Sequence, residues 1–141
     1  MDTVARVTWV SGPVVRAEVT GQTQMMEQVT VSDYRLVGEV IGLRGDIATI
    51  QVYEDTSSIQ PGAPVYGTGA PLSVELGPGL IGNIFDGIQR PLEALADASG
   101  SFIERGVTAA PLDRERLWKF EPGATEGSTV SGGMVLGTVP E

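Results

Sequence analysis

Short apolar runs, separated by turn-forming residues at a spacing of about ten, fill the first half of the sequence. This spacing is typical of an all-β barrel or sandwich, in which each run forms one strand. Within residues 14–20, apolar residues at 15, 17 and 19 alternate with polar ones, and a period of two excludes a helix there. We therefore predict six strands, over Thr3–Val10, Val14–Thr20, Met25–Val31, Leu36–Leu43, Ile47–Tyr53 and Pro64–Gly67.

Turn residues mark each break between these runs. Glycine permits a positive φ and proline fixes φ, so both favour chain reversal. We expect the tightest hairpin to join the fourth and fifth strands through Gly45-Asp46. The other breaks are Gly12-Pro13, Gly21, Asp33 and Pro61-Gly62.

The character of the sequence changes at Leu72, where a glycine-rich segment begins. Only its last third has a helical pattern, and we predict one short helix over residues 91–98. Pro91 suits the first helical position, Glu93 suits the positive N-terminal end, and Ser99-Gly100 supplies a stop. The predicted apolar face consists of Leu92, Leu95 and Ala96.

Residues 101–141 return to a β pattern but supply only part of a domain. The last run is followed by Pro140-Glu141 with no closing strand, so we expect the sequence to end where a longer chain was cut or cleaved. The predicted runs are Phe102-Ile103, Val107-Thr108, Trp118–Phe120, Thr129-Val130 and Met134–Val139.

The composition of the 141 residues excludes several classes of function. The chain has no cysteine and no histidine, which removes disulfides, thiolate chemistry and an imidazole base. Its formal net charge of −9 disfavours direct binding to nucleic acid, which depends on clustered basic residues. No run approaches the ~18–20 apolar residues of a membrane-spanning helix. The N-terminus lacks the features of a secretory signal, so we expect a cytoplasmic location.

One glycine motif invites a nucleotide-binding interpretation. Residues 77–82 satisfy G-x-G-x-x-G, and Asp97 lies twenty residues beyond Gly77. A dinucleotide fingerprint must open a sustained helix, whereas Gly87 and Pro91 interrupt this segment at once, so we interpret the motif as a structural turn. A phosphate-binding P-loop is absent because the only lysine, Lys119, follows no such loop and is interpreted as a surface cation.

Acidic and aromatic residues have structural interpretations. Glu54-Asp55 precedes a polar stretch and is predicted to lie in a solvated loop, and residues 113–116 carry compensating charges that suit an exposed turn. The aromatic side chains lack interleaved basic residues, so we expect them to lie in the core or to contact a neighbouring subunit. They are Trp9, Tyr34, Tyr53, Tyr66, Phe85, Phe102, Trp118 and Phe120.

These motifs, in this order, resemble the sequence of a known protein family. The run VYEDTSSIQPGAPVYGTGAPLSVELGPGLIGNIFDGIQRPLE, and within it LGPGLIGNIFDGIQRPL, resembles the N-terminal part of the catalytic A subunit of V-type and archaeal-type rotary ATPases. The resemblance extends upstream through GPVVRAEV and LVGEVIGLRGDIATIQVYEDT, and downstream through LDRERLWKFEP and GGMVLGTVPE. It covers essentially the whole sequence.

This resemblance implies a mainly β fold in three parts. Residues 1–68 would form a six-stranded barrel, 69–110 a connector toward a nucleotide-binding domain, and 111–141 the start of the β insertion found in A subunits. In the family the barrels of alternating A and B subunits form a ring, and the insertion lies near the peripheral stalks. The complex associates peripherally with a membrane and moves H⁺ or Na⁺.

The resemblance carries over no catalytic, cofactor-binding or metal-binding residue. The family's Mg-ATP site depends on a P-loop that this sequence lacks, so the expected role of these residues is assembly. Charges on the exposed faces of the strands are the candidate contact residues: Arg16, Glu18, Glu39 and Arg44.

Two other classes of function stay open. The sequence is compatible with a free-standing β-barrel binding module. The size of the native product would distinguish such a module from the N-terminal part of an A subunit. A lipoyl or biotinyl carrier domain is suggested by TEGSTVSGGMVLGTV, but it requires a lysine at a hairpin tip and residues 121–141 contain none.

Overall fold

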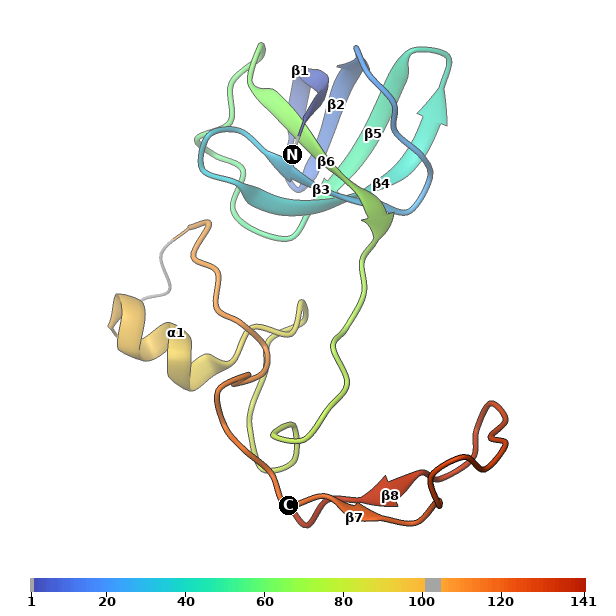
Figure 1. The fold of residues 1–141 in the computed structure, drawn as a ribbon. Coiled ribbons are helices and arrows are strands. Elements are labelled where there is room, and N and C mark those ends of the chain that lie inside the picture. Colours follow the sequence, from blue (N-terminus) through green and yellow to red (C-terminus); the bar gives the residue numbers. More distant parts are fainter. Residues whose placement is uncertain (1, 101–104) are drawn as a thin grey trace. The chain divides into compact units, whose positions relative to one another are not determined.

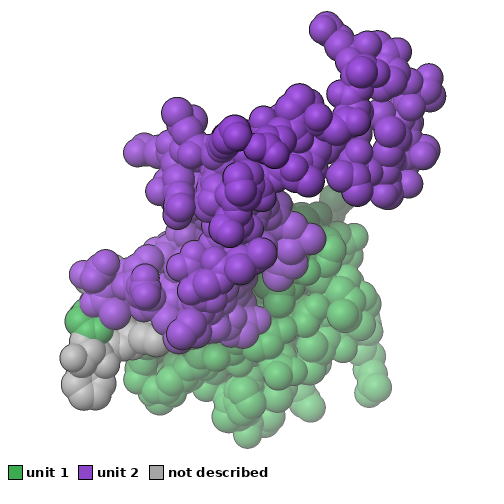
Figure 2. All heavy atoms as spheres, turned by 90° about the horizontal axis from the view of Figure 1, so that it is seen from below, with its two compact units in different colours: residues 1–73, 99–107 green, residues 74–98, 108–141 purple. Residues whose placement is uncertain are grey.

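A computed structural model describes residues 2–100 and 105–141 of the chain. The chain divides into two compact units (Figure 2). The first comprises residues 1–73 and 99–107, and the second comprises residues 74–98 and 108–141. The predicted run Phe102-Ile103 lies outside the described residues.

The first unit contains a closed antiparallel barrel of six strands, ordered β1-β2-β5-β4-β3-β6 (Figure 1). The sequence prediction of six strands is therefore confirmed. β6 is longer than predicted, and the strand predicted from Met25 begins two residues later because Met26 has a φ of 64°, which is not extended. The strands are β1 (Thr3–Ser11), β2 (Val14–Val19), β3 (Glu27–Val31), β4 (Leu36–Arg44), β5 (Ile47–Val52) and β6 (Pro64–Pro71).

Two hairpins of the barrel have two-residue loops. Gly45-Asp46 joins β4 to β5 as predicted, but Gly12-Pro13 joins β1 to β2 with a loop of the same length. The β4–β5 hairpin is therefore as tight as expected, but the β1–β2 hairpin is equally tight. Gly12 and Gly45 both have a positive φ, of 53° and 60°, which these short reversals require.

The interior of the barrel is filled by small and branched aliphatic side chains. On β2 the predicted alternation holds, with Val15 and Ala17 fully buried, Val19 half-buried, and Arg16 and Glu18 exposed. Packing is close enough that β4 needs a glycine: a Cβ at Gly38 would lie 2.7 Å from the Gln51 carbonyl oxygen. Leu36, Ile50 and Val65 are among the largest side chains that are wholly enclosed.

A buried carboxylate joins β3 to β6. Glu27 is only 2% exposed, and its Oε2 accepts hydrogen bonds from the Thr23 hydroxyl (2.8 Å) and the Gln24 N–H (3.0 Å). Its Oε1 accepts from the Gly69 N–H at 2.9 Å. A Cβ at Gly67 would meet that same oxygen at 2.6 Å, so glycine leaves room for the carboxylate. This side chain fastens the loop before β3 to the end of β6.

The second unit contains one helix, α1 (Leu92–Ser99). It matches the predicted helix to within one residue, and the Pro91 carbonyl accepts a hydrogen bond from Leu95 N (3.0 Å) at its start. Leu95 is fully buried and Leu92 is half-buried, but Ala96 is exposed, so the predicted apolar face is narrower than expected. Among the residues described, no helix has the length and apolar character needed to span a membrane.

The strands of the second unit are much shorter than predicted. β7 (Glu121–Pro122) pairs with β8 (Gly137–Thr138), and this two-residue ladder is the whole sheet in the described part of the unit. β8 lies within the predicted run Met134–Val139. The predicted strands at 107–108, 118–120 and 129–130 are wrong. Most side chains of residues 121–141 are exposed, so no core drives longer pairing there.

We predict that replacing Glu27 with glutamine destabilises the barrel by about 2 kcal/mol. Both carboxylate oxygens accept a backbone N–H, so an amide must place its own NH₂ group against one of these donors. Glu18→Gln, at an exposed position on β2, serves as the control and should change stability by less than about 0.5 kcal/mol. Urea denaturation followed by circular dichroism measures both, and equal midpoints for the two variants would contradict the role assigned to Glu27.

Candidate functional site

The glycine motif of residues 77–82 forms turns, and no helix begins within it. Its interpretation as a structural turn is thereby supported. Gly79 and Gly82 have φ values of 101° and 85°, which side-chain-bearing residues rarely adopt. A Cβ at Gly77 would lie 3.0 Å from Leu112 Cδ1, and one at Gly79 would lie 3.5 Å from Trp118 Cζ2. Gly77 therefore allows Leu112 to lie close to the loop, whereas Trp118 lies at an ordinary contact distance from position 79.

The segment Asp86–Arg90 is a loop closed by its own side chains. Asp86 Oδ1 accepts hydrogen bonds from Ile88 N (3.1 Å) and Arg90 N (2.8 Å), and Oδ2 pairs with Arg90 Nε at 2.7 Å. Gln89, at a φ of 62°, exchanges two side-chain hydrogen bonds of 2.6 Å with the backbone of Glu75. The polar residues of this segment thus hold the backbone that leads into α1.

The pKa of Asp86 reflects this arrangement. Partial burial raises it, but the hydrogen bonds from the Arg90 backbone and side chain and from Ile88, together with the guanidinium charge, outweigh burial and hold the pKa below 3.8. The carboxylate is therefore the form that the folded loop favours.

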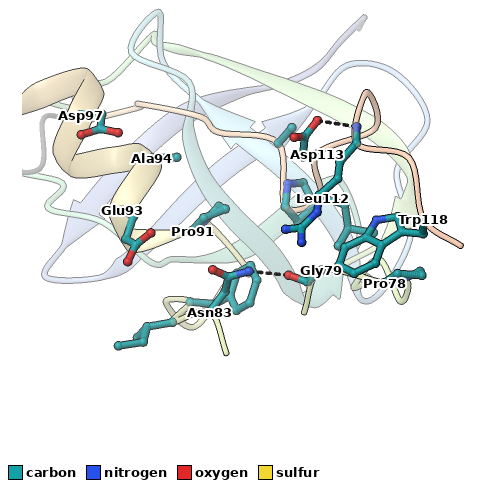
Figure 3. Close-up of a pocket in the computed structure, with 15 residues that line it drawn as sticks. Pro78, Gly79, Asn83, Pro91, Glu93, Ala94, Asp97, Leu112, Asp113 and Trp118 are labelled. Carbon is teal, nitrogen blue, oxygen red and sulfur yellow. Dashed lines mark hydrogen bonds between the residues drawn. The ribbon is translucent and has the colours of Figure 1, made fainter. Parts of the chain in front are cut away.

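A cavity of about 480 Å³ lies in the second unit beside α1 (Figure 3). Glu93 and Asp97 come from α1, and Asp113, Arg116 and Trp118 come from the segment after it. Gly79 and Asp97 line the same cavity, but the helix that would connect them in a dinucleotide site is absent. Arg116 lies over the ring of Trp118 at 4.1 Å, and Asp113 Oδ1 accepts the Arg116 N–H at 3.2 Å. The cavity holds carboxylates and one guanidinium without a nucleophile activated by a base.

The paired acids at positions 54 and 55 hold a returning segment of the chain. Asp55 pairs with Arg105, and Glu54 Oε2 accepts the Gly106 N–H at 2.9 Å. The backbone N–H and hydroxyl of Ser57, aided by Arg105, keep the pKa of Asp55 below its usual value. These residues lie in a loop in which Asp55 is exposed, as predicted, and their side chains also hold residues 105 and 106.

The predicted exposed turn at residues 113–116 is present. Asp113 Oδ1 also accepts the Glu115 N–H at 2.9 Å, and Arg114 pairs with Glu75 at 2.7 Å. Lys119 is exposed as predicted and pairs with Glu121 at 2.6 Å.

The four candidate contact residues lie on the outside of β2 and β4. Arg16 stands opposite Trp9 on β1 and Thr49 on β5, while Glu18 and Arg44 both stand opposite Ile47. Arg16 and Arg44 line one shallow hollow of about 420 Å³, together with Leu43, Ile47 and Thr49. Glu39 lies farther along β4, opposite Gln51, and accepts a hydrogen bond from the Tyr53 hydroxyl at 2.8 Å.

Sequence reasoning missed the apolar part of this outer face. Trp9 is 44% exposed with the Arg16 guanidinium 4.9 Å from its ring centroid, and Leu43 is 37% exposed. Exposed apolar side chains ringed by charges are typical of protein interfaces. The sequence pattern could have predicted this apolar surface. Trp9, Ile47 and Leu43 occupy outward positions in strands whose inward positions are already apolar.

The aromatic side chains do not form the core. None of those described is buried, and Trp9, Tyr34, Tyr53 and Phe120 are all at least 40% exposed. Phe102 lies outside the described residues. The expectation of a core position is wrong because the barrel interior accommodates Val, Ile, Leu and Ala, whereas contact with a neighbouring subunit stays a prediction.

Comparison with known proteins agrees with this architecture. The family model described as the ATP synthase alpha/beta family, beta-barrel domain, matches residues 7–69. A second model, the ATP synthase alpha/beta subunit barrel-sandwich domain, matches residues 109–141. The chain belongs to the ATP synthase alpha/beta family.

Its relatives are A subunits. The chain is 54% identical over all of its 141 residues to the V-type ATP synthase alpha chain of Halothermothrix orenii. It is 52% identical over 138 residues, or 98% of the chain, to the A subunit of the A-type ATP synthase from Desulfurococcus sp., and 53% over 138 residues to that from Thermococcus onnurineus. In all three cases it spans 24% of the relative's length.

We predict that Asp86 titrates below pH 3.8 in the folded chain and that Arg90→Ala moves the midpoint upward. Because the folded-state pKa is lowered, the loop gains stability above pH ~3.8, and this gain is lost as the pH falls through the folded-state pKa. NMR of the side-chain carboxyl carbon measures the midpoint. Arg114→Ala, which removes a guanidinium paired with Glu75 instead, is the control. A midpoint that stays fixed in Arg90→Ala would show that Arg90 does not set the pKa.

Proposed function

We propose that this chain is the barrel-bearing part of the catalytic A subunit of a V-type or A-type rotary ATPase. The observation that carries the proposal is the identity of 52–54% to A subunits over nearly every residue of the chain. Because the chain spans only a quarter of these relatives, the coupled activity, ATP synthesis or hydrolysis linked to H⁺ or Na⁺ transport, is proposed for the longer polypeptide in its complex.

The division of the chain follows from the same proposal. Residues 1–68 are the assembly barrel, 69–110 the connector toward a nucleotide-binding domain, and 111–141 the start of the A-subunit insertion. The family models matched at 7–69 and 109–141 support this division. In the complete complex the chain would be cytoplasmic and held peripherally at the membrane.

The proposed role of the barrel is to hold alternating A and B subunits in a ring, with the insertion directed to a peripheral stalk. A closed barrel suits this role because each strand is paired on both sides. Neighbouring subunits therefore contact a rigid surface. The outer face of β1, β2, β5 and β4 supplies the exposed Trp9, the basic Arg16 and Arg44, and the apolar Leu43 and Ile47.

We predict that the double variant Arg16→Glu and Arg44→Glu binds the B subunit of the same organism about tenfold more weakly than the parent chain. Reversing two charges at the rim of an interface replaces attraction with repulsion. Sedimentation velocity measures the association constant, and circular dichroism verifies that the barrel is folded. Glu126→Lys, an exposed charge change in the second unit, is the control. An unchanged association constant in the double variant would reject this face as the contact.

We predict that the chain alone binds no Mg-ATP, because the proposed nucleotide site belongs to the rest of the polypeptide. The only lysine is paired with Glu121, and the glycine loop at 77–82 opens no helix to receive phosphates. Isothermal titration calorimetry with Mg-ATP should give no heat beyond dilution. Saturable binding in the micromolar range would contradict the assignment of the site to another part of the polypeptide.

A further inference from the structure

The glycine loop directs two backbone N–H groups at a single carboxylate oxygen. Glu141 Oε1 accepts a hydrogen bond from Ile81 N at 3.1 Å and a shorter one from Gly79 N. Both donors and the acceptor belong to the second unit. The side chain of the last residue thus returns to a loop sixty residues earlier.

The backbone conformation accounts for this convergence. Gly79 adopts a φ of 101°, and the Gly79 carbonyl is held by Asn83 Nδ2 at 2.5 Å (Figure 3). While that carbonyl is bonded to Asn83, the N–H groups of residues 79 and 81 both donate to Glu141 Oε1. Backbone amides brought together in this way by a left-handed residue form a concave site for an anion.

A cation lies in the same region of the unit. The side chain of Trp118 packs against the position of Gly79, and the Arg116 guanidinium lies over the Trp118 ring. Arg116 and Gly79 also line one cavity. The same cavity is also lined by the carboxylates of Glu93, Asp97 and Asp113, so the two convergent amides, and not the net charge around them, favour the Glu141 carboxylate.

We propose that the loop of residues 79–81 is a carboxylate receptor whose ligand is the side chain of Glu141. The contact fastens the segment after β8 to the glycine loop, across a unit whose sheet has only two-residue strands. The G-x-G-x-x-G segment thus forms an anion-binding site from backbone amides, and the bound anion is the Glu141 carboxylate of the same chain. This inference does not depend on the proposed role in a rotary ATPase.

The test compares Glu141→Gln and Glu141→Ala with the parent chain by ¹H–¹⁵N NMR. The amide proton signals of Gly79 and Ile81 should move upfield in both variants, and their hydrogen exchange in Glu141→Ala should become about tenfold faster, as expected for a lost charge-assisted hydrogen bond. Glu126→Gln, another exposed glutamate of the second unit, should leave both signals in place.

Sodium acetate then tests whether the loop accepts a carboxylate as such. Added to Glu141→Ala, it should shift the Gly79 and Ile81 signals back toward their parent positions, and it should leave the parent chain unchanged. The proposal is overturned if these two signals stay fixed in both Glu141 variants. It is also overturned if acetate shifts them equally in the parent chain, because the site would then be vacant in solution.

Discussion

Closure of the barrel by β6 is the constraint on which the first unit depends. β6 pairs with β1 on one side and β3 on the other, so it completes the hydrogen bonding of both strands that would otherwise be edges. The buried Glu27 carboxylate strengthens the pairing of β3 with β6 through its hydrogen bond to Gly69. Gly67 leaves the space that this carboxylate occupies. Without β6, the apolar interior of five strands would be open to solvent and to other chains.

The second unit is organised by a different balance of forces. Leu95 is its one fully buried apolar side chain among the residues described, and its sheet is two residues long. Its backbone is held by polar groups: Asp86 with Arg90, and Gln89 with the backbone of Glu75. Such interactions are individually modest, so the unit relies on several of them acting together. This difference explains why the barrel obeys simple hydrophobic patterning and the second unit does not.

The sequence predicted those elements whose formation depends on local patterning. Short apolar runs separated by turn residues identified all six strands of the barrel, and Pro91 with Gly100 bracketed α1. It failed for the strands at 107–108 and 129–130, because β propensity produces a strand only where a partner and a core are present. Of the two positions expected for Trp9 and Tyr53, the core was wrong, since burial depends on the volume inside the closed barrel.

The candidate contact residues were likewise predicted only in part. Sequence placed Arg16, Glu18, Glu39 and Arg44 on exposed faces, but only the strand register shows that Arg16 and Arg44 line one hollow while Glu39 lies apart. The return of Arg105 to Asp55, fifty residues away, left no local pattern in the letters. Long-range contacts of this kind come from topology, which single-sequence reasoning does not resolve.

The attachment of residues 105–107 to the barrel makes position 106 unusually sensitive to size. Gly106 has a φ of 69°, and a methyl group there would overlap the Tyr34 carbonyl oxygen. Even alanine would therefore push this segment away from Tyr34, at a position that belongs to none of the six strands. The size of the residue at this position thus controls how tightly the barrel holds the segment that returns to it.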